Sequence, residues 1–78
     1  MKIRVSYYAM FREEAGRSGE VVDASGDAAA LFESLKTRYG FSLCRSQVRL
    51  AVNDAFVEWS SPLSDDDQIV FIPPVAGG

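Results

Sequence analysis

One segment of the sequence has a helical period, and it constrains the fold more than any other feature. Asp27 can cap the first turn of a helix because its carboxylate accepts hydrogen bonds from unpaired amides, and Gly40 is a typical C-terminal stop. Between them, apolar residues recur every three or four positions and would share one face: Ala28, Leu31, Phe32, Leu35 and Tyr39. We therefore expect one main helix with a single apolar face to bury.

The rest of the chain favours short strands. Apolar and polar residues alternate at 3–9, 48–52 and 68–72, which is the period of a half-buried strand. Smaller elements are expected at 10–15 (a helical turn stopped by Gly16), at 20–22 and at 56–59 (two short strands). One helix and one mixed sheet make a two-layer α+β domain, and this order of elements is that of the β-grasp, or ubiquitin-like, fold.

The predicted helix and strands should bury one shared core in a single domain, 1–78. The chain has 78 residues and one cysteine, so the core must hold without a disulfide framework, as expected in a reducing compartment such as the cytoplasm. We interpret Cys44 as a half-buried packing residue, with a thiol that hands over sulfur as the alternative. The core is expected to contain Ile3, Val5, Tyr7, Leu31, Leu35, Leu50, Val52, Ile69 and Phe71.

Charge and residue types exclude several classes of function. The net charge is −3, and eight Lys and Arg residues are scattered among eleven acids without a basic stripe, which argues against binding of nucleic acid. With no histidine and one cysteine, the chain lacks Ser-His and Cys-His nucleophiles and the ligands of a zinc site. Its apolar runs are too short to span a bilayer. We expect no bound metal or cofactor and no membrane partner.

The last residues have the composition of an extended arm. Pro73 and Pro74 follow the last predicted strand, and paired prolines fix the backbone in an extended exit. Val75 and Ala76 are apolar, which suits a lined groove on a partner better than water. We therefore predict that residues 73–78 form a tail that binds a partner protein.

The tip of this tail offers one reactive group. Gly77 and Gly78 have no side chains, so the tip can enter a channel too narrow for other residues. The carboxylate that it delivers is ionised and inert at neutral pH, because a terminal carboxyl has a pKa of about 3.5. Its usual activation is an acyl-adenylate, made with ATP by another protein. The tail is therefore predicted to be first a substrate and then a reagent, with Gly78 as the reacting residue.

Three stretches resemble one known family. Residues 62–78 resemble the closing motif of molybdopterin synthase small subunits, and Pro-Pro-Val-x-Gly-Gly is the most specific part. Residues 51–53 look like that family's third-strand ending, and 7–16 are similar to its opening strand and helical turn. The resemblance covers essentially the whole chain. Asp66 stands where this family commonly has glycine, and Ala76 where it commonly has threonine.

The resemblance implies a sulfur carrier with a β-grasp fold whose first and last strands are parallel neighbours. An adenylating enzyme would activate Gly78 with ATP, and a sulfur donor would convert the adenylate to a thiocarboxylate. The tail would then enter the large synthase subunit, where its sulfur builds the dithiolene of molybdopterin on a cyclic pyranopterin phosphate. The resemblance also implies a heterotetramer of two small and two large subunits, in which this chain is not catalytic alone.

Three other interpretations remain open. Thiamine-pathway sulfur carriers share the fold and the Gly-Gly end, although they usually lack the paired prolines. A ubiquitin-like protein modifier would use the same activated glycine to join lysines. In the third interpretation, the chain is an interaction domain whose C-terminal tail takes part in no reaction. The product discriminates between the first two classes, because carriers form a thiocarboxylate and modifiers an isopeptide bond.

Strand parity predicts where the partner docks. If Ile3 and Val5 face the helix, Tyr8 points to the opposite side of the sheet, and Ile72 does so on the last strand. Parallel pairing of these strands would bring Tyr8 and Ile72 close, and Phe56 could join them from the turn after Asn53. We expect this surface to dock the large subunit, the alternative being exposed residues without a partner.

Overall fold

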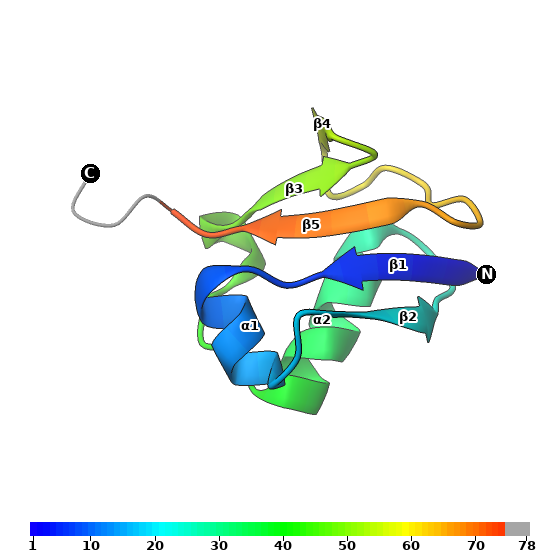
Figure 1. Cartoon of the computed structure of the whole chain (residues 1–78). Coiled ribbons are helices and arrows are strands. Elements are labelled where there is room, and N and C mark those ends of the chain that lie inside the picture. The colour runs from blue at the N-terminus through cyan, green and yellow to red at the C-terminus, as the bar shows by residue number, and fades with distance from the viewer. Residues whose placement is uncertain (75–78) are drawn as a thin grey trace.

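The first and last strands of the chain lie side by side at the centre of a five-stranded sheet (Figure 1). This is a computed structural model, and it describes residues 1–74. The sheet order is β2-β1-β5-β3-β4; β1 and β5 are parallel, and the other neighbours are antiparallel. In chain order the elements are β1 (Lys2–Ser6), α1 (Ala9–Ala15), β2 (Gly19–Asp23), α2 (Ala28–Tyr39), the 3-10 turn η1 (Arg45–Gln47), β3 (Arg49–Val52), β4 (Ala55–Val57) and β5 (Gln68–Ile72).

This arrangement confirms the predicted α+β, β-grasp fold. The main helix, α2, begins where the sequence predicts, because Asp27 Oδ1 accepts a hydrogen bond from Ala30 N at 2.9 Å. It ends at Gly40, whose φ of 71° lies in the left-handed region that favours glycine. Among the described residues, no helix is long and apolar enough to cross a membrane.

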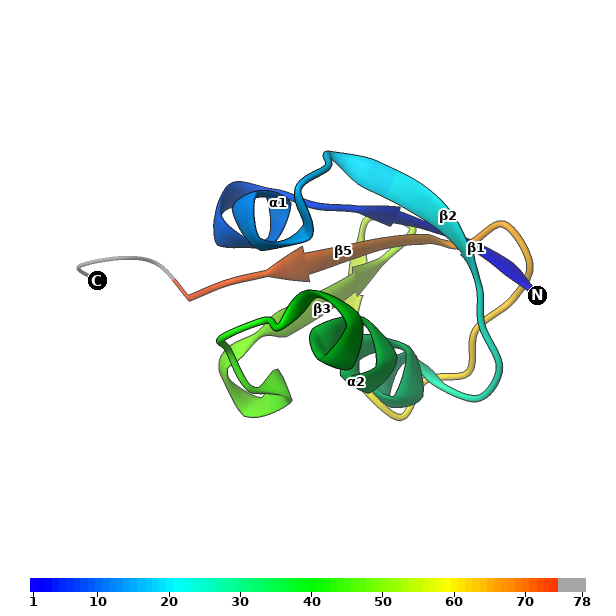
Figure 2. The ribbon, with the colours of Figure 1, turned by 90° about the horizontal axis from the view of Figure 1, so that it is seen from below.

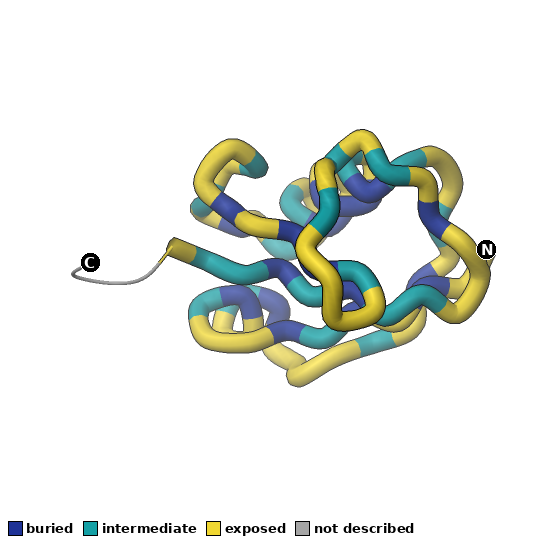
Figure 3. Tube along the Cα trace, turned by 90° about the horizontal axis from the view of Figure 1, so that it is seen from above, coloured by how far each residue is buried: buried dark blue, intermediate teal, exposed yellow. Residues whose placement is uncertain are grey.

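The core lies between the sheet and α2, as the alternation of buried and exposed positions predicts (Figures 2 and 3). Eight of the nine residues predicted for it are buried, and the ninth, Val52, is half-buried against the others. Aromatic rings that the prediction did not place in the core also fill it. Phe11 and Phe32 pack edge-to-face against Phe41 and Phe71, with ring centroids 5.0 Å apart in each pair.

Three details correct the predictions. The first strand ends at Ser6 rather than at residue 9, because the backbone turns at Ala9, with a φ of 52°, to begin α1. In the segment 56–59, only Phe56 and Val57 pair with β3, as the last two residues of β4. Cys44 is exposed rather than half-buried, because it lies just before η1, where its backbone N–H donates to Gln47 Oε1.

The two turns that flank β5 and β3 use left-handed backbone. Asn53 and Asp54 have φ of 51° and 69°, as a tight two-residue hairpin requires, and Asn is among the residues best suited to this conformation. Asn53 also accepts a hydrogen bond from Gln68 N, which ties the hairpin to the start of β5. Asp66, before β5, has a φ of 67° without being glycine or asparagine.

Candidate functional site

The candidate tail is attached to the centre of the sheet. β5 pairs with β1 on one side and with β3 on the other, so its last residue, Ile72, belongs to a strand held along both edges. Pro73 is half-buried and Pro74 is exposed. The other predicted tail residues, Val75, Ala76, Gly77 and Gly78, lie outside the described residues. In Figure 1 the C-terminal end of β5 lies beside the start of β3 and near α1.

An apolar patch lies on the outer face of the sheet, which we define as the face opposite α2. It consists of Ala51, Phe56, Val70 and Ile72, which together with Asp54 line a shallow hollow of about 230 Å³. Its members come from β3, β4 and β5, because the register places Ala51 opposite both Phe56 and Val70. The structure therefore brings together two of the predicted docking residues, Phe56 and Ile72. We call these four residues the outer-face patch.

Tyr8, the third predicted docking residue, does not line this hollow. The pairing of β1 with β5 ends at Ser6 and Val70, two residues before Tyr8, so no strand pairing joins Tyr8 to Ile72. Tyr8 instead precedes α1 and is 58% exposed. Its place on the docking surface stays a prediction.

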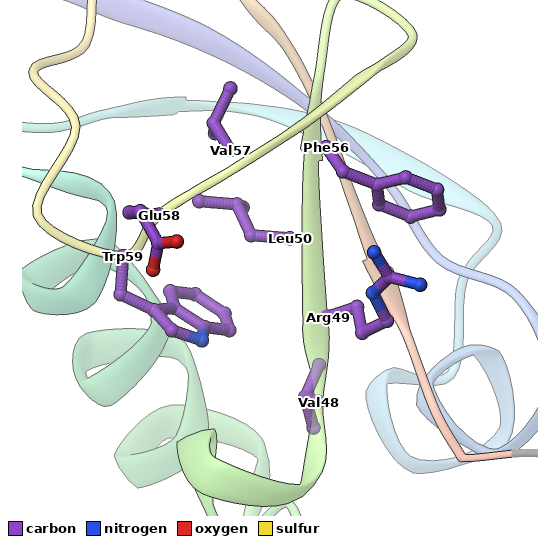
Figure 4. A pocket seen from close by; sticks show the side chains of 7 residues that line it. All are labelled: Val48, Arg49, Leu50, Phe56, Val57, Glu58 and Trp59. Carbon is purple, nitrogen blue, oxygen red and sulfur yellow. The ribbon is translucent and has the colours of Figure 1, made fainter.

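Sequence reasoning missed one residue on the outer face, Arg49. Its guanidinium carbon lies 3.9 Å from the centre of the Phe56 ring, in a cation–π contact (Figure 4). Figure 4 shows both side chains on the same side of β3, with Leu50 and Trp59 on the other. Alternation along β3 was a signal that Arg49 faces outward, but the contact depends on the pairing of β3 with β4, which makes Arg49 and Phe56 diagonal neighbours.

A second missed feature is a carboxylate on the helix side of the sheet that joins β2 to α2 and to the connections before and after α1. Glu20 Oε2, in β2, accepts hydrogen bonds from Tyr7 at 2.6 Å and from Tyr39 at 2.5 Å, and its other oxygen accepts one from Arg17 at 3.2 Å. Partial burial acts to raise the pKa of Glu20. The two tyrosine hydrogen bonds and the charges of Arg17 and Arg38 outweigh this effect, so the pKa lies below its usual range.

The same burial acts on the phenol of Tyr7. Burial, together with the hydrogen bond to Glu20, raises the pKa of Tyr7 far above its ordinary value, so this residue is a neutral hydrogen-bond donor. Tyr7 is the last buried residue before α1. Glu20 and its three hydrogen-bond donors, Tyr7, Arg17 and Tyr39, therefore hold the chain in place where it leaves β1. We assign this cluster a structural role.

Candidate metal ligands do not converge in the part of the chain described here. Among residues 1–74, no group of three or more Asp, Glu, Cys or His side chains is placed to hold a metal ion. Neighbours on a helix such as Glu13 and Glu14 point in different directions, and Glu14 accepts a hydrogen bond from Ser42 Oγ at 2.8 Å.

Comparison with known proteins decides the family. The sequence description of the ThiS family matches residues 5–78, which include nearly the whole fold and the Gly-Gly end. The chain belongs to the ThiS family. The molybdopterin synthase sulfur carrier subunits of Mycobacterium tuberculosis and Escherichia coli are 34% and 32% identical to it. These alignments cover 100% and 97% of this chain and 99% of each relative. The resemblance seen in the sequence is confirmed.

Solved structures agree with this assignment. In a complex of subunits 1 and 2 of the molybdopterin-converting factor of Helicobacter pylori, the matching chain is 25% identical, with a TM-score of 0.73 and full coverage of both chains. The small archaeal modifier protein 1 of Methanosarcina acetivorans has a TM-score of 0.82, with coverage of 99% of this chain and 96% of that one. At 23% identity, the second likeness shows the fold alone.

Proposed function

We propose that this chain is the sulfur carrier subunit of a molybdopterin synthase. The observation that carries the proposal is its full-length match, at 32% and 34% identity, to sulfur carrier subunits of that enzyme. The Pro-Pro-Val-x-Gly-Gly ending supports it, because it supplies an extended arm with a narrow tip. We propose the cytoplasm as its compartment.

Gly78 is the residue that carries sulfur in this proposal. A partner enzyme transfers AMP from ATP to the carboxylate of Gly78 and releases pyrophosphate. A sulfur donor then displaces AMP and leaves a thiocarboxylate. In the large subunit, the sulfur attacks a cyclic pyranopterin phosphate and forms a thioester with it. Water then cleaves the bond between the Gly78 carbonyl carbon and the sulfur, which leaves the sulfur on the pterin and regenerates the carboxylate. In the same proposal, Gly77 keeps the tip narrow, Pro73 and Pro74 favour an extended exit from the sheet, and Val75 and Ala76 contact a lined groove of the partner. ATP is bound by the partner, and this chain needs no cofactor of its own.

The outer-face patch is the proposed docking surface for the large subunit. Phe56 is 56% exposed, although a large apolar side chain is usually better covered, and it lines the same hollow as Val70 and Ile72 of β5, the strand that leads into the tail. The two-subunit complex from Helicobacter pylori supports a partner of this class. The same proposal includes a heterotetramer of two small and two large subunits. It also includes Tyr8 as a further residue that contacts the large subunit.

Intact mass measurement tests the carrier step. The purified chain is incubated with ATP, the adenylating enzyme and a sulfide source, and we expect a mass gain equal to the replacement of one oxygen by sulfur. Deletion of Gly78 should abolish this gain and leave the thermal unfolding midpoint nearly unchanged, because the core residues among residues 1–74 all precede the tail in the sequence. Sulfur on the Gly78-deleted chain would refute the proposal, and an isopeptide-linked product would favour a protein modifier instead.

Calorimetric titration against the large subunit tests the docking surface. Tyr8→Glu and Ile72→Glu should each weaken the complex by about 2 kcal/mol, as at an interface hot spot, without unfolding the domain. Val21→Glu is a matched control, because Val21 is 61% exposed on the edge strand β2, two strands away from β5. Unchanged affinity for both test variants would mean that the large subunit docks elsewhere.

A further inference from the structure

Arg49 is an exposed cation that is held in place by an aromatic ring rather than by an acid. Its guanidinium lies over Phe56 at 3.9 Å, and the residue is exposed. Ion pairs among residues 1–74 involve Lys2, Arg17 and Arg45, and no described carboxylate lies within 4.0 Å of the Arg49 guanidinium nitrogens. Asp54 lines the adjoining hollow without pairing with it. Within the described part of the chain, the charge of Arg49 is therefore uncompensated.

Stacking leaves the hydrogen-bonding edge of a guanidinium available. The guanidinium carbon lies over the ring, and no hydrogen bond joins the N–H donors of Arg49 to another described residue. These donors form the planar fork that matches the two oxygens of a carboxylate. Because the ring already restricts the long side chain, less conformational entropy is lost when a carboxylate binds. An arginine prepared in this way is suited to a carboxylate supplied from outside the chain.

The position of Arg49 connects it with the tail. In the register of β3 and β5, Arg49 lies opposite Ile72, the last residue of β5. The chain leaves the sheet immediately afterwards, through Pro73. A partner that covers the outer-face patch and also takes up the tail must therefore contact the Arg49–Phe56 pair.

We propose that the Arg49–Phe56 pair binds an Asp or Glu side chain of the large synthase subunit, at the edge of the outer-face patch nearest the tail. This inference rests on the proposed function and adds to it a charge requirement on the partner. The apolar patch supplies contact area, and Arg49 fixes the orientation by a two-pronged hydrogen bond to the carboxylate.

The test is calorimetric titration of the large subunit with four forms of the full chain: wild type, Arg49→Glu, Arg49→Lys and Arg45→Glu. Arg45→Glu is the matched control, since it changes the net charge equally at η1, where Arg45 makes only a long, exposed contact of 3.9 Å with Glu33. We expect Arg49→Glu to weaken binding at least tenfold and Arg49→Lys about threefold to tenfold, because lysine keeps the charge without the planar fork. Arg45→Glu should change binding less than twofold.

The outcomes separate this inference from the function on which it rests. Two results would overturn the role of Arg49 and leave the carrier function in place. In the first, the Arg49→Glu variant binds the large subunit as tightly as the wild type does. In the second, Arg49→Glu and Arg45→Glu lose the same amount of affinity. Absence of binding by the wild type overturns both. A repeat in higher salt should weaken the wild type more than Arg49→Glu, since only the wild type has the ion pair to screen.

Discussion

Removal of the Glu20 carboxylate is expected to destabilise the domain by leaving two tyrosine hydroxyls without their acceptor. Glu20 has a side chain that is 10% exposed, and it receives hydrogen bonds from Tyr7, which is buried, and Tyr39, which is half-buried. A buried donor left unpaired costs about 1–3 kcal/mol. We assign about 2 kcal/mol to Tyr7 and about 1 kcal/mol to Tyr39, which can turn toward water. Glu20→Ala should therefore lower the free energy of unfolding by about 3 kcal/mol.

Urea denaturation of Glu20→Ala, Tyr7→Phe and the double variant measures this loss. In a domain of this size, about 3 kcal/mol corresponds to a fall of roughly 12–24 °C in the unfolding midpoint. Glu20→Ala leaves the Tyr7 hydroxyl without a hydrogen-bond acceptor, and Tyr7→Phe removes that hydroxyl. Glu20→Ala should therefore lower the free energy of unfolding by about 2 kcal/mol less in the Tyr7→Phe variant than in the wild type. Strictly additive free energies in the cycle would refute the reasoning, because they would show that Tyr7 does not depend on Glu20.

The same carboxylate gives a pH dependence with a definite sign. The pKa of Glu20 is lowered in the folded state, so its contribution to stability is present above its unfolded pKa of about 4.3 and is lost as pH falls through the lower folded value. The difference in unfolding free energy between the wild type and Glu20→Gln should therefore shrink as pH falls below about 4.3. The carboxyl of Asp23 also has a lowered pKa, because it accepts a hydrogen bond from Lys2. Asp23 is present in both the wild type and Glu20→Gln, so its contribution cancels in the difference between their unfolding free energies. A difference that stays constant with pH would contradict the assignment.

Two further predictions concern local backbone. Asp66→Gly should raise the free energy of unfolding by about 0.5–1 kcal/mol, because glycine adopts the φ of 67° found at Asp66 without strain. Asp65→Gly is the control and should lower stability, because it removes the carboxylate that accepts a hydrogen bond from Lys2 N. Thermal denaturation compares the two variants. Asp27→Ala should lower it by about 1 kcal/mol through loss of the α2 cap, and Asp27→Asn should keep most of the stability, so equal losses for the two in urea denaturation would contradict the capping role.

The elements that could be predicted from the sequence are those specified by neighbours along the chain. The start and end of α2 follow from Asp27 and Gly40, because helix capping depends on residues that are close in the sequence. The inward-facing residues of β1 and β5 follow from the alternation of apolar and polar residues, which is also a property of neighbours in the sequence. The end of β1 could not be predicted in this way. Tyr7 continues the alternation, yet its N–H bonds to Ser18 O in the loop, and the left-handed backbone at Ala9 has no local signal.

The side-chain clusters escaped prediction because their members meet only in three dimensions. Glu20 is joined to Tyr7, which follows β1, and to Tyr39 in α2. The sequence pattern placed Tyr7 in the core and Tyr39 on the apolar face of the helix, and it does not indicate where their hydroxyl groups bond. Phe56 was expected on the docking surface, but its contact with Arg49 requires the register of a three-residue strand. The predicted reacting residue, Gly78, followed from composition and resemblance, and it lies outside the described residues.

The central position of β5 has a consequence for how the protein is made. Val5 pairs with Ile69, so the middle of the sheet joins the first strand of the domain with the last strand. Until β5 leaves the ribosome, β1 and β3 each lack a neighbour, and the apolar faces of α2 and β1 have no completed core to enter. Such long-range pairing is slow to form, and the incomplete chain exposes strand edges that favour aggregation. A chain that has folded has therefore already acquired the strand on which its tail is carried.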